Sequence, residues 1–164
     1  MKCKLSKIAP LSGNKASTYS VIIDNDSKTL FEHFIEENFS SHLSEINSIL
    51  ARLKTIANKT GAREHFFKLN EGIPGDGVCA LYDEPNKKLR LYCIRFGTQT
   101  IILGGGGEKI KTARTFQEIQ KLKDENYLLR QISQAITHKI KERELYFGEN
   151  DMDFIGSLEF YIED

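Results

Sequence analysis

Apolar residues recur at helical spacing in the first third of the chain and predict two consecutive helices. The first follows Ser27, which can cap a helix, and Thr60-Gly61 ends the second. The apolar stripe of the first helix consists of Leu30, Phe31, Phe34, Ile35 and Phe39. That of the second helix consists of Leu43, Ile46, Leu50, Leu53 and Ala57. Between the two helices, Phe39-Ser40-Ser41 leaves a short connection, so we expect an antiparallel helical hairpin with one apolar face to bury.

Short apolar runs rich in β-branched and aromatic residues predict the strands. One run, 19–24, precedes the helices, and four follow them at 65–69, 77–82, 89–96 and 100–103. Turn residues in short connections separate the last four, which favours antiparallel neighbours. The order of elements predicts an α+β fold in which a helical hairpin packs on a twisted, mainly antiparallel sheet of about four to five strands.

The last third predicts additional C-terminal helices and a tail. Thr115 and Glu118 form a capping-box pattern that begins one helix, and Asp124 can cap another. The apolar stripe of that last helix consists of Leu129, Ile132, Ile136 and Ile140. The acidic tail after Arg143 either folds over a basic face or ends as a docked strand, and the alternation of Leu158, Phe160 and Ile162 favours the strand.

Composition indicates one ordinary globular domain. The chain has 164 residues, of which 40% are hydrophobic and 28% are charged, and its formal net charge is zero. The three cysteines show no spacing typical of zinc ligands or of a disulfide framework, and no run of about 18 apolar residues predicts a membrane span. We therefore expect a cytoplasmic protein without a metal or a cofactor. Residues 1–124 would form the main domain, with its core at about 19–123, and 125–164 would add a helix and the tail.

Four consecutive glycines, Gly104 to Gly107, follow the strand predicted at 100–103. A phosphate-binding loop would need a fixed glycine–lysine pattern and a helix that begins directly after it, and the sequence has neither. Two alternatives remain. The glycines either end the strand and let it bend close to another backbone, or form a loop that admits a ribose-phosphate backbone.

Positive charge gathers around these glycines although the whole chain is neutral. Residues 63–123 hold eleven basic and seven acidic residues, a net charge of +4. Alternation along 89–96 places Arg90 and Tyr92 on the same face of their strand. The two side chains either stabilise the fold or present a cation and a phenol to a phosphodiester. RNA can be cleaved in this way without a metal, by a base, an acid and cations that stabilise the phosphorane.

The segment HFFKLNEGIPGDGVCALYDEPNKKLRLYCIRFGTQTIILGGGGEKIKTARTFQEIQKL, with the strand and helical hairpin before it, resembles the RelE/ParE superfamily of bacterial toxins and most closely its HigB-like branch. The resemblance implies the toxin of a type II toxin–antitoxin system, a ribosome-dependent, metal-independent endoribonuclease that inhibits translation. Its partners would be a cognate antitoxin protein, the ribosome and messenger RNA, with no membrane involved.

Carried over by position, the resemblance makes Lys68 and Arg90 catalytic, with Tyr92 as a candidate acid or base. The RNA-binding cations would be Lys109, Lys111 and Arg114. Strand 77–82 has Cys79 and Ala80 where the family often has an arginine. Two other functions stay open, because fold does not fix function. One is a non-catalytic protein-interaction module with a toxin-like fold, and the other is a gyrase inhibitor of the ParE type.

Overall fold

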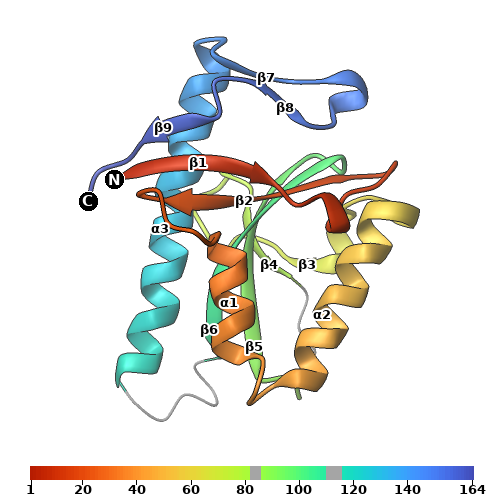
Figure 1. The fold of residues 1–164 in the computed structure, drawn as a ribbon, viewed down its shortest axis with the longest axis vertical. Coiled ribbons are helices and arrows are strands. Elements are labelled where there is room, and N and C mark those ends of the chain that lie inside the picture. The colour runs from red at the N-terminus through yellow and green to blue at the C-terminus, as the bar shows by residue number, and fades with distance from the viewer. Residues whose placement is uncertain (82–85, 110–115) are drawn as a thin grey trace.

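The computed structural model of the protein describes residues 1–81, 86–109 and 116–164 (Figure 1). Within these ranges the chain is α+β, with three α-helices and a mostly antiparallel seven-stranded sheet. The helices are α1 (Leu30–Asn38), α2 (Leu43–Thr55) and α3 (Phe116–Lys141). The sheet strands are β1 (Lys2–Lys7), β2 (Ser17–Ile23), β3 (Phe67–Lys68), β4 (Val78–Leu81), β5 (Leu89–Phe96), β6 (Thr100–Glu108) and β9 (Glu159–Tyr161).

The strands follow the order β3-β4-β5-β6-β2-β1-β9. The pair of β2 and β6 is parallel, and the other pairs are antiparallel. The prediction of four to five strands was too small because residues 1–18 carried no assignment and because the tail adds one strand. Alternation in β1 was readable, since the buried Cys3 and Leu5 flank the exposed Lys4, but the run is short.

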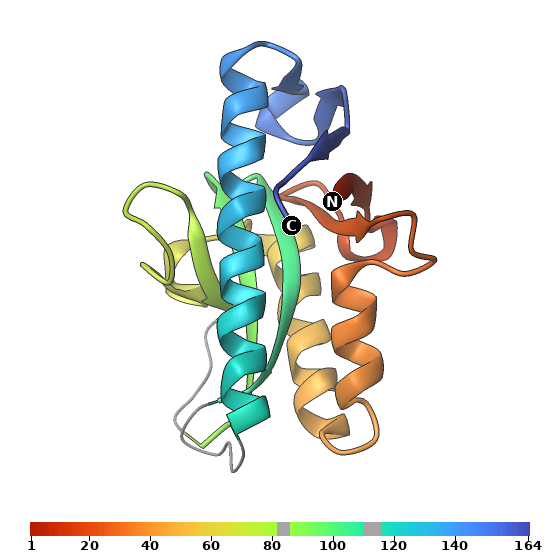
Figure 2. The same ribbon diagram turned by 90° about the vertical axis from the view of Figure 1, so that its left-hand side faces the viewer.

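Helices cover both faces of the sheet (Figure 2). Residues of α1 and α2 share one buried cluster with Cys79, Leu91 and Cys93, so the helical hairpin packs on one face as predicted. Residues of α3 share a second cluster with Ala80, Tyr92 and other residues of the opposite face. The hairpin begins later than expected. Thr29, and not Ser27, caps α1 through a capping box with Glu32 (Glu32 N to Thr29 Oγ1, 3.1 Å).

One long helix replaces the two C-terminal helices that the sequence predicted. Asp124 caps nothing, because it lies inside α3 and accepts a hydrogen bond from Gln120 one turn earlier (2.8 Å). The predicted capping residue Thr115 lies outside the described residues. Helix α3 also runs through the predicted boundary between residues 124 and 125, so it joins the two segments.

After α3 the chain forms a small hairpin and then returns to the sheet. Strands β7 (Leu145–Phe147) and β8 (Phe154–Gly156) pair with each other, and Phe154 packs edge-on against Tyr19. Strand β9 then pairs antiparallel with β1, and the amino group of Met1 lies 2.9 Å from a carboxylate oxygen of Asp164. The acidic tail therefore docks as an edge strand, beside the N-terminus (Figure 1).

The glycines lie inside β6, which corrects the prediction that the strand ends at Leu103. All four are buried. A Cβ atom at Gly105 would lie 2.4 Å from Glu125 Oε2 of α3, and one at Gly106 would lie 1.9 Å from the carbonyl oxygen of Arg90. Glycine is required at Gly106, where the backbone of β5 comes too close for a side chain, so the prediction of a close backbone approach is confirmed at this position.

Candidate functional site

Three strands place Lys68, Ala80 and Tyr92 in one row across the sheet. In the antiparallel register Lys68 is opposite Ala80, and Ala80 is opposite Tyr92. Directly opposite residues point to the same face, here the face that α3 covers. Ala80 lies between the lysine and the tyrosine in this row and is fully buried. The row unites two predicted catalytic residues that are far apart in sequence.

Arg90 joins this row from the same strand as Tyr92. Two residues apart on β5, the side chains share a face, and Tyr92 accepts a hydrogen-bonding contact from Arg90. Across from them, β6 has only glycines, because Arg90 is opposite Gly107. The register shifts between Leu91 and Cys93, which leaves Tyr92 opposite a bulge of β6. We call the face formed by Arg90, Tyr92 and residues 104–107 the glycine platform.

The phenol of Tyr92 is held in its protonated form. Only 5% of the residue is exposed. Burial raises the pKa of the Tyr92 hydroxyl above its ordinary value, and the hydrogen bonds with Arg90 and Asn126 oppose this only in part. A phenol with a raised pKa keeps its proton at neutral pH, so it can donate a proton to a leaving oxygen. Of the two predicted roles, acid or base, the environment favours the acid.

Two polar residues that the sequence did not single out complete the cluster. The carboxylate of Glu71 lies 3.3 Å from Lys68 Nζ and acts electrostatically on Tyr92. Asn126 of α3 donates a hydrogen bond to the carbonyl oxygen of Glu71 (2.8 Å) and contacts the Tyr92 hydroxyl. Neither belongs to a motif. Glu71 lies in a glycine-rich connection, and Asn126 lies on the side of α3 that faces the sheet, so only tertiary structure brings them together.

Helix α3 covers the glycine platform with charged side chains. Lys121 lies 3.7 Å from the position that a Cβ of Gly107 would take, and its ammonium lies 3.1 Å from Glu37 of α1 and 3.2 Å from Glu125. Glu125 packs over Gly105, and burial raises the pKa of its carboxyl group, against the opposing effect of Lys121. The platform is therefore closed by α3 in this structure.

The predicted RNA-binding cations lie beyond the platform. Lys109 directly follows β6, is 7% exposed, and donates its backbone N–H to the carbonyl oxygen of Lys88 (2.8 Å). Lys111 and Arg114 lie outside the described residues. The structure therefore brings together Lys68, Arg90 and Tyr92, and it places Lys109 at the end of the strand that forms the platform.

A second polar cluster lies on the opposite face, at the turn between α1 and α2. His42 Nε2 lies 2.8 Å from Glu108 Oε1, and His42 Nδ1 lies 3.8 Å from Glu45 Oε2. Glu45 also accepts hydrogen bonds from the backbone N–H groups of Lys88 and Leu89 (2.9 and 3.1 Å). These contacts tie the helical hairpin to the ends of β5 and β6, so the cluster has a clear structural role.

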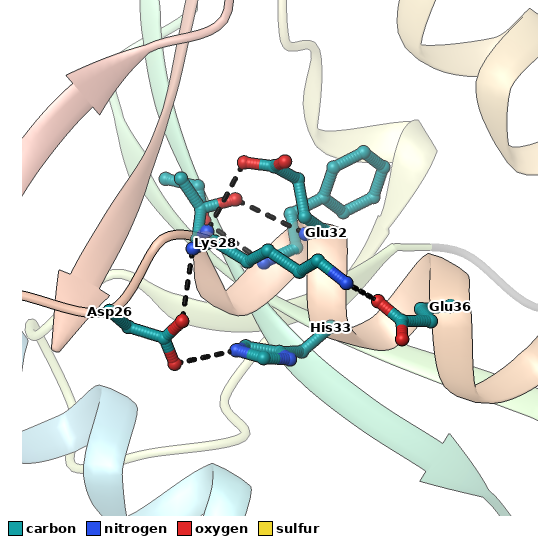
Figure 3. A network of polar contacts seen from close by, with 8 residues as sticks. Asp26, Lys28, Glu32, His33 and Glu36 are labelled. Carbon is teal, nitrogen blue, oxygen red and sulfur yellow. Dashed lines mark hydrogen bonds and ion pairs between the residues drawn. The ribbon is translucent and has the colours of Figure 1, made fainter.

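An apolar groove of about 790 Å³ runs between the end of β1 and α1. Its floor includes Ile8, Phe31 and Ile35, and its end includes Phe39, which is 52% exposed. A polar network borders it (Figure 3). Asp26 accepts a hydrogen bond from Lys28 N (3.0 Å) and pairs with His33 (2.8 Å), while the Lys28 ammonium pairs with Glu36.

Comparisons with known proteins found no match for the chain. No protein-family model, no curated protein and no solved structure matches it. In the parts of the chain that the structure describes, no three His, Cys, Asp or Glu side chains gather as metal ligands would. None of the helices in those parts is long and apolar enough to cross a membrane.

Proposed function

We propose that this chain is the toxin of a type II toxin–antitoxin pair, an endoribonuclease that cleaves messenger RNA on the ribosome. The observation that carries the proposal is the shared face of Lys68, Arg90 and Tyr92, which come from two strands and point to one side of the sheet. The partners would be a cognate antitoxin, the ribosome and its messenger, and the reaction would need no cofactor.

The chemistry follows from the side chains at this face. Cleavage of RNA by its own 2′-hydroxyl requires removal of that proton, stabilisation of the negative phosphorane, and protonation of the 5′ leaving oxygen. The guanidinium of Arg90 and the ammonium of Lys68 supply positive charge for the phosphorane. Tyr92, whose raised pKa keeps the hydroxyl protonated, supplies the leaving-group proton.

Glu71 is the proposed base. Its carboxylate lies beside Lys68 and acts electrostatically on Tyr92, so an acceptor and a donor of protons belong to the same cluster. General acid–base groups of this kind contribute about 10² to 10⁴ in rate each. Lys109, with Lys111 and Arg114, would hold the RNA backbone at the end of β6, because cations next to a strand end can bind successive phosphates.

Controlled expression in a bacterial host tests the proposal. Wild-type protein should arrest growth and cleave messengers on ribosomes, and Arg90→Ala should relieve both effects. Tyr92→Phe should reduce cleavage while it leaves the aromatic ring in place. A matched control is Arg63→Ala, which removes the same charge from an exposed arginine whose Nε bonds the Thr60 carbonyl. Arrest by an Arg90→Ala protein that unfolds like the wild type would refute the assignment of Arg90.

The apolar groove favours a second candidate function, a non-catalytic protein-interaction module. Exposed Phe39 and buried Phe31 line the same groove, and apolar grooves of this volume are common binding sites. This function predicts harmless expression of the wild type and a stable complex with a partner chain. Phe39→Asp should abolish the complex without changing stability, whereas the nuclease proposal predicts that Phe39→Asp still cleaves messengers in the absence of antitoxin.

A further inference from the structure

The two halves of α3 are held to the sheet by different forces. From Leu129 onward the buried positions are apolar, and Ile132 and Ile136 are fully buried in a cluster with strand residues. We call residues 116–126 the lid segment. Leu122 is the buried apolar side chain among those described in this segment, and the contacts that Lys121 and Asn126 make with other elements are polar. Leu129, Ile132 and Ile136 anchor the C-terminal half by hydrophobic burial, whereas among the described side chains of the lid segment only Leu122 is buried in this way.

Two polar contacts latch the lid segment over the platform. Asn126 bonds the Glu71 carbonyl and contacts Tyr92, and Lys121 reaches across to Glu37 of α1. The Lys121 side chain is 37% exposed, and that of Glu37 is 46% exposed, so water screens this ion pair. Contacts of this kind are weak one by one, which makes the lid segment the easiest part of the helix to release.

The surface beneath the lid segment contributes little apolar adhesion. Residues 104–107 are all glycine, so β6 offers backbone and no side chains to α3 there. The same surface contains Arg90 and Tyr92. Flat backbone bordered by a cation and an aromatic ring suits single-stranded RNA, which tracks cations with its phosphates and stacks bases on aromatic rings.

We propose that the lid segment is an autoinhibitory cover that leaves the glycine platform when single-stranded RNA binds, while the C-terminal half of α3 stays in place. The identity of the ligand rests on the proposed function. In the closed state Asn126 forms a hydrogen bond with the hydroxyl of Tyr92. Release of Asn126 makes that hydroxyl available to the RNA. An equilibrium between closed and open states lowers the apparent affinity for RNA by the fraction of molecules that are open.

The test compares Asn126→Ala and Lys121→Ala with the wild type and with Gln120→Ala. Gln120 lies in the same segment, but its side chain bonds Asp124 within the helix and does not reach the sheet. Hydrogen exchange of residues 116–126 measures opening. Binding of a ~10-nucleotide 2′-O-methyl oligouridine, which this chemistry cannot cleave, measures access to the platform at fixed salt.

Loss of either latch should speed exchange in the lid segment and tighten binding of the oligonucleotide about fivefold, with exchange at 132–140 unchanged. Gln120→Ala should behave as the wild type. Faster exchange without tighter binding would overturn the lid, and so would unchanged exchange in both latch variants. Because the oligonucleotide is not cleavable, tighter binding by variants that never cleave messengers would retain the lid and refute only the nuclease.

Discussion

The two faces of the sheet differ in what their side chains do. On the face of the helical hairpin, Leu91 and Cys93 of β5 lie in a cluster of apolar side chains from α1, α2 and the strands. On the opposite face the same strand presents Arg90 and Tyr92, and α3 meets them with Lys121, a glutamate and Asn126. One strand thus borders an apolar layer on one side and a partly polar layer on the other.

This difference between the faces indicates which polar residues the stability of the fold does not require. A polar group costs free energy when it is buried, unless it finds hydrogen-bonding partners, so a helix that only had to cover a sheet would be served better by apolar side chains. The hairpin face shows that this chain can build such a layer. The polar residues of the α3 face are therefore the stronger candidates for function, and substitutions there should affect activity more than stability.

The largest expected effect is a difference in stability between alanine substitutions at two adjacent glycines of β6. Gly106 is opposite Leu91, and a Cβ there would meet the Arg90 carbonyl at 1.9 Å, whereas a Cβ at Gly107 would have 3.7 Å to its nearest neighbour on α3. Gly106→Ala should lower the free energy of unfolding by roughly 3 kcal/mol or prevent folding. Gly107→Ala should change it by less than about 1 kcal/mol. Urea unfolding of both variants checks this, and equal losses would contradict the geometry.

The next effect compares neighbours on β5. Leu91→Ala should lower the free energy of unfolding by about 3 kcal/mol, because the leucine is 1% exposed and leaves a cavity. Tyr92→Phe removes one hydroxyl and should cost about 1 kcal/mol. Denaturant unfolding gives both values, and messenger cleavage should be lost only in the folded Tyr92→Phe protein. Comparable losses of stability in Leu91→Ala and Tyr92→Phe would mean that both faces contribute equally to the stability of the fold.

A smaller effect depends on pH. Burial raises the folded-state pKa of Tyr92, so the group stabilises the fold below the unfolded pKa of about 10 and loses that contribution as pH rises through the folded value. Tyr19 shifts in the same direction through burial. Between about pH 9 and 11 the wild type should therefore lose more stability than Tyr92→Phe, in which Tyr19 still titrates. Parallel losses in the two proteins would contradict the raised pKa of Tyr92.

The smallest expected effect is a difference in the alkylation rates of the three native cysteines, which report local opening of the fold. Burial raises the pKa of Cys3 to about 11 and that of Cys79 to about 12, and the pKa of Cys93 lies well above its ordinary value. All three thiols should resist iodoacetamide at pH 8 in the folded protein and react after unfolding. Cys3 should react first, because its strand is held by the short edge strand β9. Mass spectrometry of alkylated peptides gives the order, and early reaction of Cys93 would contradict it.

Local patterns predicted much of the fold. The strand at 89–96 matches β5, and the stripes ending at Thr60-Gly61 match α1, α2 and the short π-helical turn Ile56–Thr60. The end of β6 was predicted too early because glycine disfavours strands, and the reason for glycine at Gly106 is the close approach of the β5 backbone. Asp124 was wrongly predicted to cap a helix because the sequence does not distinguish a capping aspartate from one inside a helix. The structure shows that Asp124 lies inside α3 and accepts a hydrogen bond from Gln120.

For the candidate site, alternation alone places Arg90 and Tyr92 on one face, because the side-chain period of a strand is two. The sequence likewise determines the amphipathic helices, the excess of positive charge around the sheet and the separation of the cysteines. Only tertiary structure decides that Lys68 joins the same face through the register of three strands, that Glu71 and Asn126 meet there, and that α3 closes over it. Register, packing distance and burial arise from contacts between residues distant in sequence, and no local pattern encodes them.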